Sequence, residues 1–244
     1  INPREYPANV YRRTKAGMSG ELVQAPEIDL FIQEEARVLE GCPGLGFPEF
    51  HGVVEHKDRP VIATEFVHGS TLRQRMVMDE LQNRMPNLEV LVDIAATLSQ
   101  AQNNGLEYHG DLKPENLILR NNRSIALIDP AVSISKYSAF VTTPHYNPLL
   151  TRTSHTDVMS LGIIMYEWYT KILPFDNVPY WFAGEPVFGE TDRLYLSNFL
   201  SHHPPQDVNR KIPSPIAAII TKALTHPEYT IEQMHADLGD FMNR

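Results

Sequence analysis

The sequence predicts an α+β fold in which a small β-rich part with one helix precedes a larger, mainly helical part. Runs rich in β-branched residues occupy residues 51–55 and 60–67, and the polar residues 56–59 between them suit a hairpin turn. Beyond these runs, apolar residues recur mainly at the three- and four-residue spacing of amphipathic helices. We therefore expect two domains, one of residues 1–67 and one of residues 68–244.

Five segments of the chain carry helical periodicity. The first, residues 28–39, lies in the β-rich part and is followed by Gly41 as a stop signal. The other four predicted helices are residues 87–104, 157–169, 214–224 and 231–242. Two short apolar runs, residues 117–119 and 125–128, flank a polar turn and predict a second small hairpin. Residues 1–27 carry only weak signals for short strands or loops.

The composition is typical of a globular protein and argues against one class of partner. The chain has 244 residues, of which 42% are hydrophobic and 21% charged, enough to bury a substantial core. Its net charge is -9 and its isoelectric point about 5.5. Because binding to a nucleic-acid backbone needs clustered Lys and Arg, we expect no nucleic-acid partner, although a nucleotide ligand stays possible.

Cysteine content and hydropathy bear on the expected compartment. Cys42 is the only cysteine, so it forms no intrachain disulfide, and we expect a small buried thiol in a reducing, cytoplasmic setting. No apolar run approaches the length of a membrane span, and no signal peptide is visible. Because Ile1 is not a methionine, we expect that an upstream segment, with any targeting information, has been removed.

The residues best suited to chemistry are concentrated in residues 109–116, which read His-Gly-Asp-Leu-Lys-Pro-Glu-Asn and follow a long predicted helix. A further acid, Asp129, lies beyond the second predicted hairpin. Together these groups can position a nucleophile, neutralise phosphate charge and hold a divalent ion. Phosphoryl transfer needs chiefly alignment and electrostatic stabilisation, so these residue types favour that reaction.

Residues 109–116 resemble the catalytic loop of eukaryotic-type protein kinases, H-x-D-L-K-P-x-N, with the spacing of every key residue kept. By this resemblance Asp111 accepts the proton of the substrate hydroxyl and Lys113 steadies the γ-phosphate. Asn116 and Asp129 bind Mg²⁺ or Mn²⁺ in the same scheme. The resemblance implies a two-lobed protein-kinase-like fold with a reduced β-rich N-lobe and a helical C-lobe. It also implies ATP as a ligand and a protein as substrate or partner.

Other segments extend this resemblance across nearly the whole chain. Residues 142–148 resemble the end of an activation segment, and residues 157–162 resemble the start of the helix whose Asp braces the catalytic loop. The tripeptide Leu-Pro-Phe at residues 173–175 and the segment 223–228 fall where kinases have similar residues. The helical part of the chain is therefore the better supported of the two.

In the β-rich part, residues 63–69 resemble the kinase hinge that meets adenine. The resemblance makes Thr64 the gatekeeper and the backbone groups near Glu65 and Val67 hydrogen-bond partners of the nucleotide. Glu35 takes the place of the helical Glu that pairs with an ATP-binding lysine.

The phosphate-binding end of this part departs from the family, because residues 1–16 contain no glycine and hence no glycine-rich loop. One alignment matches residues 10–11 to the Val-Tyr after such a loop and residues 20–23 to the next strand. The position of the ATP-binding lysine then falls at residues 24–26, where the chain has none.

A second alignment takes residues 9–15 as the strand that carries the lysine. It makes Lys15 the ATP-binding residue, at about the usual distance before Glu35, and leaves the chain without the first two strands of the family. We favour Lys15 for this role, with Arg13 as a substitute.

Three further departures concern the substrate, the control of activity and a buried ion pair. The tripeptide Asp129-Pro130-Ala131 replaces the family's Asp-Phe-Gly. It is similar to the corresponding segment of fructosamine and aminoglycoside kinases, which phosphorylate small molecules. Gly110 replaces the Arg that reads a phosphorylated loop, so we expect no control by loop phosphorylation. Protein kinases normally bury an ion pair between a Glu and an Arg. Here the position of the Glu is Leu149 or Leu150, and the Arg is also missing. Loss of both partners is nearly neutral for stability.

Three functions follow from these features. A protein kinase acting on Ser or Thr is favoured, because Lys113 sits two residues after Asp111 as in that subgroup. A pseudokinase that binds or scaffolds is the second reading, from the missing phosphate loop. A kinase of small metabolites is the third, from residues 129–131.

Overall fold

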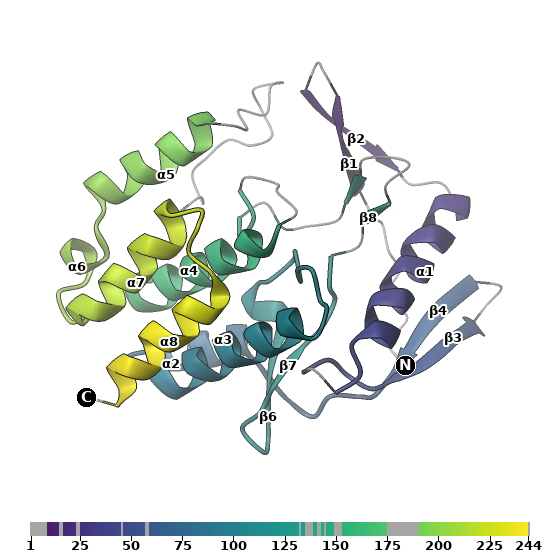
Figure 1. The fold of residues 1–244 in the computed structure, drawn as a ribbon, viewed down its shortest axis with the longest axis horizontal. Helices are drawn as coiled ribbons and strands as arrows, with labels where there is room; N and C mark the ends of the chain where they lie inside the picture. The colour runs from purple at the N-terminus through teal and green to yellow at the C-terminus, as the bar shows by residue number, and fades with distance from the viewer. Residues whose placement is uncertain are drawn as a thin grey trace.

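The structure is a computed structural model with a β-rich side and a helical side (Figure 1). It describes residues 9–14, 17–22, 25–44, 46–56, 59–131, 133–134, 139–140, 143, 145–148, 153–174 and 190–243. The β-rich side holds helix α1 (Ala25–Gly41) and the hairpin of β3 (Phe50–His56) and β4 (Arg59–Thr64). The mixed helix and sheet content confirms the predicted α+β class.

Two small sheets lie on the β-rich side. Strands β3 and β4 pair antiparallel from Phe50 opposite Thr64 to His56 opposite Arg59, which confirms the first predicted hairpin. The other sheet has the order β2-β1-β9-β8. Its strands are β1 (Asn9–Thr14), β2 (Gly17–Leu22), β8 (Ser133–Ile134) and β9 (Ala139–Phe140). The chain after residue 131 thus returns to pair with the N-terminal hairpin.

The helical side is built around α4 (Ser154–Thr170), whose residues are nearly all buried. It packs against α7 (Ser214–Thr225) and α8 (Ile231–Met242), and α8 packs in turn on α3 (Leu88–Asn103). The remaining helices are α2 (Leu72–Leu81), α5 (Glu190–His202) and α6 (Pro205–Val208). Apolar residues of these helices, α6 excepted, form one core, and Cys42 of the β-rich side also lies in it as the buried thiol that the sequence predicted.

The second predicted hairpin is present but carries an unexpected third strand. Strands β6 (Leu117–Arg120) and β7 (Ile125–Leu127) pair as expected, and β5 (Gly69–Thr71) pairs with the other edge of β6. A Cβ at Gly69 would lie 2.2 Å from the carbonyl oxygen of Leu119. Only glycine permits this approach, so β5 depends on a contact with a segment about fifty residues away.

The structure corrects one predicted boundary and adds helix α2. The strand expected over residues 60–67 ends at Thr64. One further bond, from the N–H of Glu65 to the carbonyl of Glu49 at 2.8 Å, continues its register, and the backbone of Val67 makes no hydrogen bond within the described residues. Helix α2 had no separate prediction. Its N-terminus is set by a capping box in which the side chains of Thr71 and Gln74 each accept a backbone N–H of the other.

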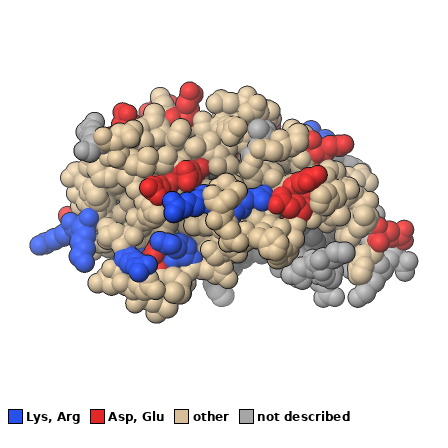
Figure 2. Space-filling model, turned by 90° about the horizontal axis from the view of Figure 1, so that it is seen from below, with Lys and Arg blue, Asp and Glu red and all other residues tan. Residues whose placement is uncertain are grey.

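The described surface shows no extended patch of one charge on the face seen from below, where Lys and Arg side chains lie among Asp and Glu (Figure 2). In addition, none of the helices in the described ranges is long and apolar enough to cross a membrane.

The contact between α4 and α7 yields a test of the core. A Cβ at Gly162 would lie 2.7 Å from Cβ of Ala223 and 3.3 Å from a methyl group of Leu224. We expect Gly162→Val to lower the free energy of unfolding by about 1–3 kcal/mol through overpacking, measured by urea denaturation. Gly239→Val in α8 is the matched control, because its Cβ would meet nothing within 4 Å. Equal losses from both variants would contradict this account.

Candidate active site

The loop of residues 109–116 is fixed from behind by Asp157, a fully buried acid in the first turn of α4. Its Oδ1 accepts the N–H of Gly110 at 2.9 Å. Its Oδ2 accepts the N–H of His109 at 2.8 Å and the side-chain amide of Gln102 in α3 at 3.1 Å. Burial raises the pKa of Asp157, and the hydrogen bonds from these N–H donors oppose that rise. The loop therefore starts from a fixed point on the most buried helix.

Gly110 allows the sharp bend that this attachment requires. Its φ is +76°, in the left-handed region, and a Cβ there would lie 2.8 Å from Cβ of Ala131 and 3.0 Å from the ring of Tyr108. Any larger residue would be strained and crowded at this position. The glycine that departs from the family pattern is thus the residue that fits this backbone.

Asp111 is the centre of a cluster that we define as Asp111, Lys113, Asn116 and Thr143 (the Asp111 cluster). The Oδ1 of Asp111 accepts the N–H of Thr143 at 2.6 Å. Its Oδ2 accepts Nζ of Lys113 at 2.7 Å and Nδ2 of Asn116 at 3.1 Å. Lys113 Nζ also donates to Oγ1 of Thr143 at 2.8 Å. Two predicted catalytic residues and one predicted metal ligand are therefore brought together around one buried carboxylate.

His109 links this loop to the segment that carries Asp129. Its Nε2 lies 3.1 Å from the carbonyl oxygen of Ile128, so Nε2 carries the proton, and its own carbonyl accepts the N–H of Ala131 at 2.7 Å. The ring is fully buried and stacks on Phe47. Burial lowers the pKa of His109, so the imidazole is held neutral.

Asn116 and Asp129, the two predicted metal ligands, lie next to each other. The N–H of Ile128 donates to the carbonyl of Asn116 at 3.0 Å, and Asn116 Nδ2 lies 3.5 Å from the carbonyl of Asp129. The φ of Asp129 is +54°, a left-handed conformation that costs a non-glycine residue about 1–2 kcal/mol. Such strain is typical of functional positions.

The predicted hinge lies directly after β4. Thr64 is exposed at the end of that strand, and Val67 three residues on is half-buried. In the described part of the chain, the backbone N–H and C=O of Val67 have no hydrogen-bond partner. The carboxylate of Glu65 pairs with Arg120 of β6 at 2.6 and 3.2 Å, and this contact lowers its pKa. A bidentate ion pair thus ties the hinge to the three-stranded sheet.

The remaining predicted site residues are the ATP-binding lysine and its acidic partner. Lys15 lies outside the described residues, while Glu35 is half-buried on α1. Strand β2 lies between residue 15 and α1 in the order of elements. Several other positions singled out in the sequence, Thr142, Pro144, Leu149, Leu150 and Phe175, also lie outside the described residues.

Sequence reasoning missed two contributors to the site. Thr143 was expected only as part of the end of an activation segment, yet it contacts both Asp111 and Lys113. Arg120 carried no motif at all, although it binds the hinge. The Thr-Pro pair at residues 143–144 was a usable signal for the first, and nothing local identified the second.

Within the described residues, no group of three His, Cys, Asp or Glu side chains could hold a metal. Two protein oxygen ligands completed by phosphate oxygens are what Mg²⁺ uses in nucleotide-dependent phosphoryl transfer.

Comparison with known proteins identifies the class to which this fold and site belong. A model of the protein kinase domain matches residues 26–225. The match covers most of the chain, and the chain therefore belongs to the protein kinase family.

Among curated proteins, the chain is similar to bacterial enzymes named as serine/threonine-protein kinases. It is 23% identical to the probable serine/threonine-protein kinase PknB of Lactococcus lactis subsp. lactis (strain IL1403), covering 95% of this chain and 39% of that protein. It is 25% identical to the serine/threonine-protein kinase PrkC of Bacillus subtilis (strain 168), covering 85% of this chain and 33% of that protein. It is 27% identical to the serine/threonine-protein kinase PknB of Mycobacterium leprae (strain TN), covering 91% of this chain and 37% of that protein. The chain thus spans less than two fifths of each relative's length.

The neutral, buried His109 predicts a pH dependence of stability. Folding lowers the pKa of His109, so below the unfolded pKa of about 6.5 the unfolded chain binds a proton that the folded chain does not. Protonation of the unfolded chain therefore lowers the free energy of unfolding as pH falls below that value. We expect the free energy of unfolding of the wild type to fall below pH 6.5 more steeply than that of His109→Phe, by up to about 1.4 kcal/mol per pH unit. Urea denaturation of both proteins from pH 8 to pH 5 measures this. Parallel pH profiles would show that His109 is not the titrating group.

Proposed function

We propose that this domain transfers the γ-phosphoryl group of ATP to a Ser or Thr hydroxyl of a protein. The observation that carries the proposal is the Asp111 cluster. It places a carboxylate, an ammonium group and an amide within hydrogen-bond distance of one another, on a loop anchored to a buried helix. The position of Lys113 two residues after Asp111 supports the Ser/Thr class.

In this reaction the acceptor hydroxyl oxygen forms a bond to the γ-phosphorus while the bond to the bridging oxygen of ADP breaks. ADP leaves with that electron pair, and the hydroxyl proton passes to a carboxylate oxygen of Asp111. Lys113 neutralises charge on the transferred group, and its contact with Thr143 fixes the direction of its side chain. Asp111 is itself oriented by the N–H of Thr143.

The residues present fit a divalent cation. Asn116 Nδ2 is engaged by both the carbonyl and the carboxylate oxygens of Asp111, at 3.0 and 3.1 Å, so its amide oxygen is the atom left for a cation. Asn116 and Asp129 would hold the Mg²⁺ or Mn²⁺, which draws charge from the phosphate oxygens when bound. Both are oxygen ligands of the kind that these ions prefer.

For the nucleotide, we propose that adenine lies at the hinge, against Thr64 and the backbone of Glu65 and Val67. The unpartnered backbone groups of Val67, within the described residues, support this placement. Glu35 would pair with the cation that holds the phosphates, for which Lys15 is the candidate and Arg13 the substitute. On this view residues 1–67 form the nucleotide-covering lobe and residues 68–244 the catalytic lobe.

The proposal is tested by transfer of radiolabelled phosphate from ATP, with Mg²⁺ or Mn²⁺, to a generic protein acceptor. We expect Asp111→Asn to lower kcat by about 100-fold or more, because the general base is lost while the shape of the cluster is kept. Glu232→Gln, an exposed acid on α8, is the matched control and is expected to retain wild-type activity. Thermal unfolding of each variant checks that the fold is intact.

Each alternative function predicts a different result. Equal transfer by the wild type and Asp111→Asn would refute the assignment of the base. A shift of the melting temperature by ATP without any transfer would support a binding or scaffolding protein. Transfer to sugars or aminoglycosides but to no protein would support a kinase of small metabolites. In an active protein, a higher KM for ATP in Lys15→Met but not in Arg13→Met would assign the phosphate-binding cation.

A further inference from the structure

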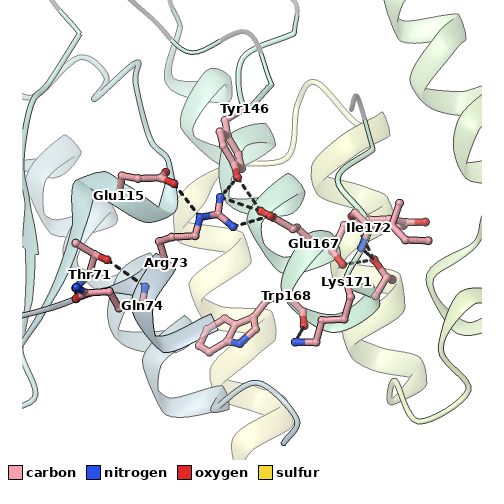
Figure 3. Close-up of polar contacts among 11 residues, drawn as sticks. Thr71, Arg73, Gln74, Glu115, Tyr146, Glu167, Trp168, Lys171 and Ile172 are labelled. Carbon is pink, nitrogen blue, oxygen red and sulfur yellow. Dashed lines mark hydrogen bonds and ion pairs between the residues drawn. The ribbon is translucent and has the colours of Figure 1, made fainter. Parts of the chain in front are cut away.

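Arg73, near the start of α2, joins three segments that are far apart in the sequence (Figure 3). Its Nε donates to Glu115 of η1 (Pro114–Asn116) at 2.8 Å, and its Nη1 donates to Glu167 of α4 at 2.6 Å. Its Nη2 contacts the hydroxyl of Tyr146, which donates to Glu167 at 2.7 Å. None of these four side chains has a role in the proposed chemistry.

Two of these partners belong to the segments that form the Asp111 cluster. Glu115 lies between Lys113 and Asn116 in the catalytic loop. Tyr146 follows Thr143 by three residues and is joined to it by a turn, in which its N–H donates to the Thr143 carbonyl at 3.0 Å. Arg73 therefore holds, at a distance from Asp111, both segments that meet at Asp111.

The contacts of Arg73 differ in how deeply they are buried, and hence in how much they contribute to stability. The Glu167 side chain is 14% exposed, whereas that of Glu115 is 48% exposed. An exposed ion pair contributes little to stability, but a buried carboxylate that loses its partner is costly. Burial opposes a charged Arg73, yet its bonds to Glu167 and Glu115 raise its pKa overall, and burial beside Glu167 raises the pKa of Tyr146. The guanidinium is thus charged and the phenol neutral in this cluster.

The geometry needs an arginine. A planar guanidinium presents several N–H groups in fixed directions and can reach Glu115, Glu167 and Tyr146 at once. A lysine has one ammonium group and can serve only part of this set. Helix α2 does not itself depend on Arg73, because Leu72 and Met76 are buried in the core.

We propose that Arg73 is a positioning residue for phosphoryl transfer: it fixes the catalytic loop and the segment that bears Thr143 and Tyr146 relative to α4. Thr143 can then reach Asp111 and Lys113 in the same geometry in every molecule. The inference rests on the proposed function, but its structural part does not need ATP.

The test uses Arg73→Gln, Arg73→Lys and the double variant Arg73→Gln with Glu167→Gln. The double variant removes the carboxylate that a single change would leave buried and unpaired, so it separates positioning from stability. The control is Arg75→Gln on the same helix. Arg75 also pairs with a buried carboxylate, that of Asp79 at 3.0 Å, but no described contact joins it to the catalytic loop.

The first readout is backbone hydrogen exchange without nucleotide. We expect exchange at Thr143 and within residues 109–116 to rise in Arg73→Gln and in the double variant, by about 10-fold or more. Exchange there stays at the wild-type level in Arg75→Gln. Exchange at the wild-type level in Arg73→Gln and in the double variant would overturn the proposal, even if the wild type transferred no phosphate.

The second readout is steady-state kinetics. We expect kcat to fall about 10- to 100-fold in Arg73→Gln and in the double variant, since misplaced groups lose alignment, while KM for ATP changes less. Arg73→Lys recovers part of the loss, and Arg75→Gln keeps the wild-type kcat. Wild-type kcat in the double variant would show that Arg73 serves stability alone. No transfer by the wild type would instead refute the proposed function and leave the exchange result to decide the positioning role.

Discussion

The site depends first on the carboxylate of Asp157. A fully buried acid is tolerated only when donors surround it, and here two of the donors are backbone N–H groups of the catalytic loop. The acid and the loop therefore require each other: without the loop, α4 would bury an unsatisfied carboxylate. Because nearly all residues of α4 are buried, the loop is attached to a helix in the core of the described residues.

Position rather than number decides which ion pairs matter. Arg37 and Glu34 pair at 2.6 Å on α1 with side chains 72% and 31% exposed, and such a pair contributes little. The pair of Lys113 with the largely buried Asp111 and the pair of Arg73 with Glu167 are different, because water cannot replace either partner at low cost. Both pairs flank the segment that bears Thr143, and their geometry therefore bears on function.

Local patterns predicted what is decided locally. The predicted limits of α8 agree with the structure to the residue, since its apolar periodicity is bounded by a capping box at Thr230 and Gln233. The long motif at residues 109–116 likewise indicated the family from residue types and spacing alone. Contacts between distant segments escaped prediction: β5 on β6, Arg120 on Glu65, and Arg73 on Glu167. These partners lie about fifty to ninety residues apart, and neither propensity nor spacing encodes which of them meet.

Gly110 marks the place where this chain departs from the family pattern at the catalytic loop. The sequence predicted that this glycine removes the Arg that reads a phosphorylated loop, and the structure shows little room for any side chain there, beside Ala131 and at positive φ. The described contacts that hold Thr143 come from Asp111 and Lys113 directly, and from Arg73 and Glu167 through Tyr146. All of these groups are encoded in the chain. Within the described residues, the geometry at Asp111 is therefore held by contacts between groups of the chain itself.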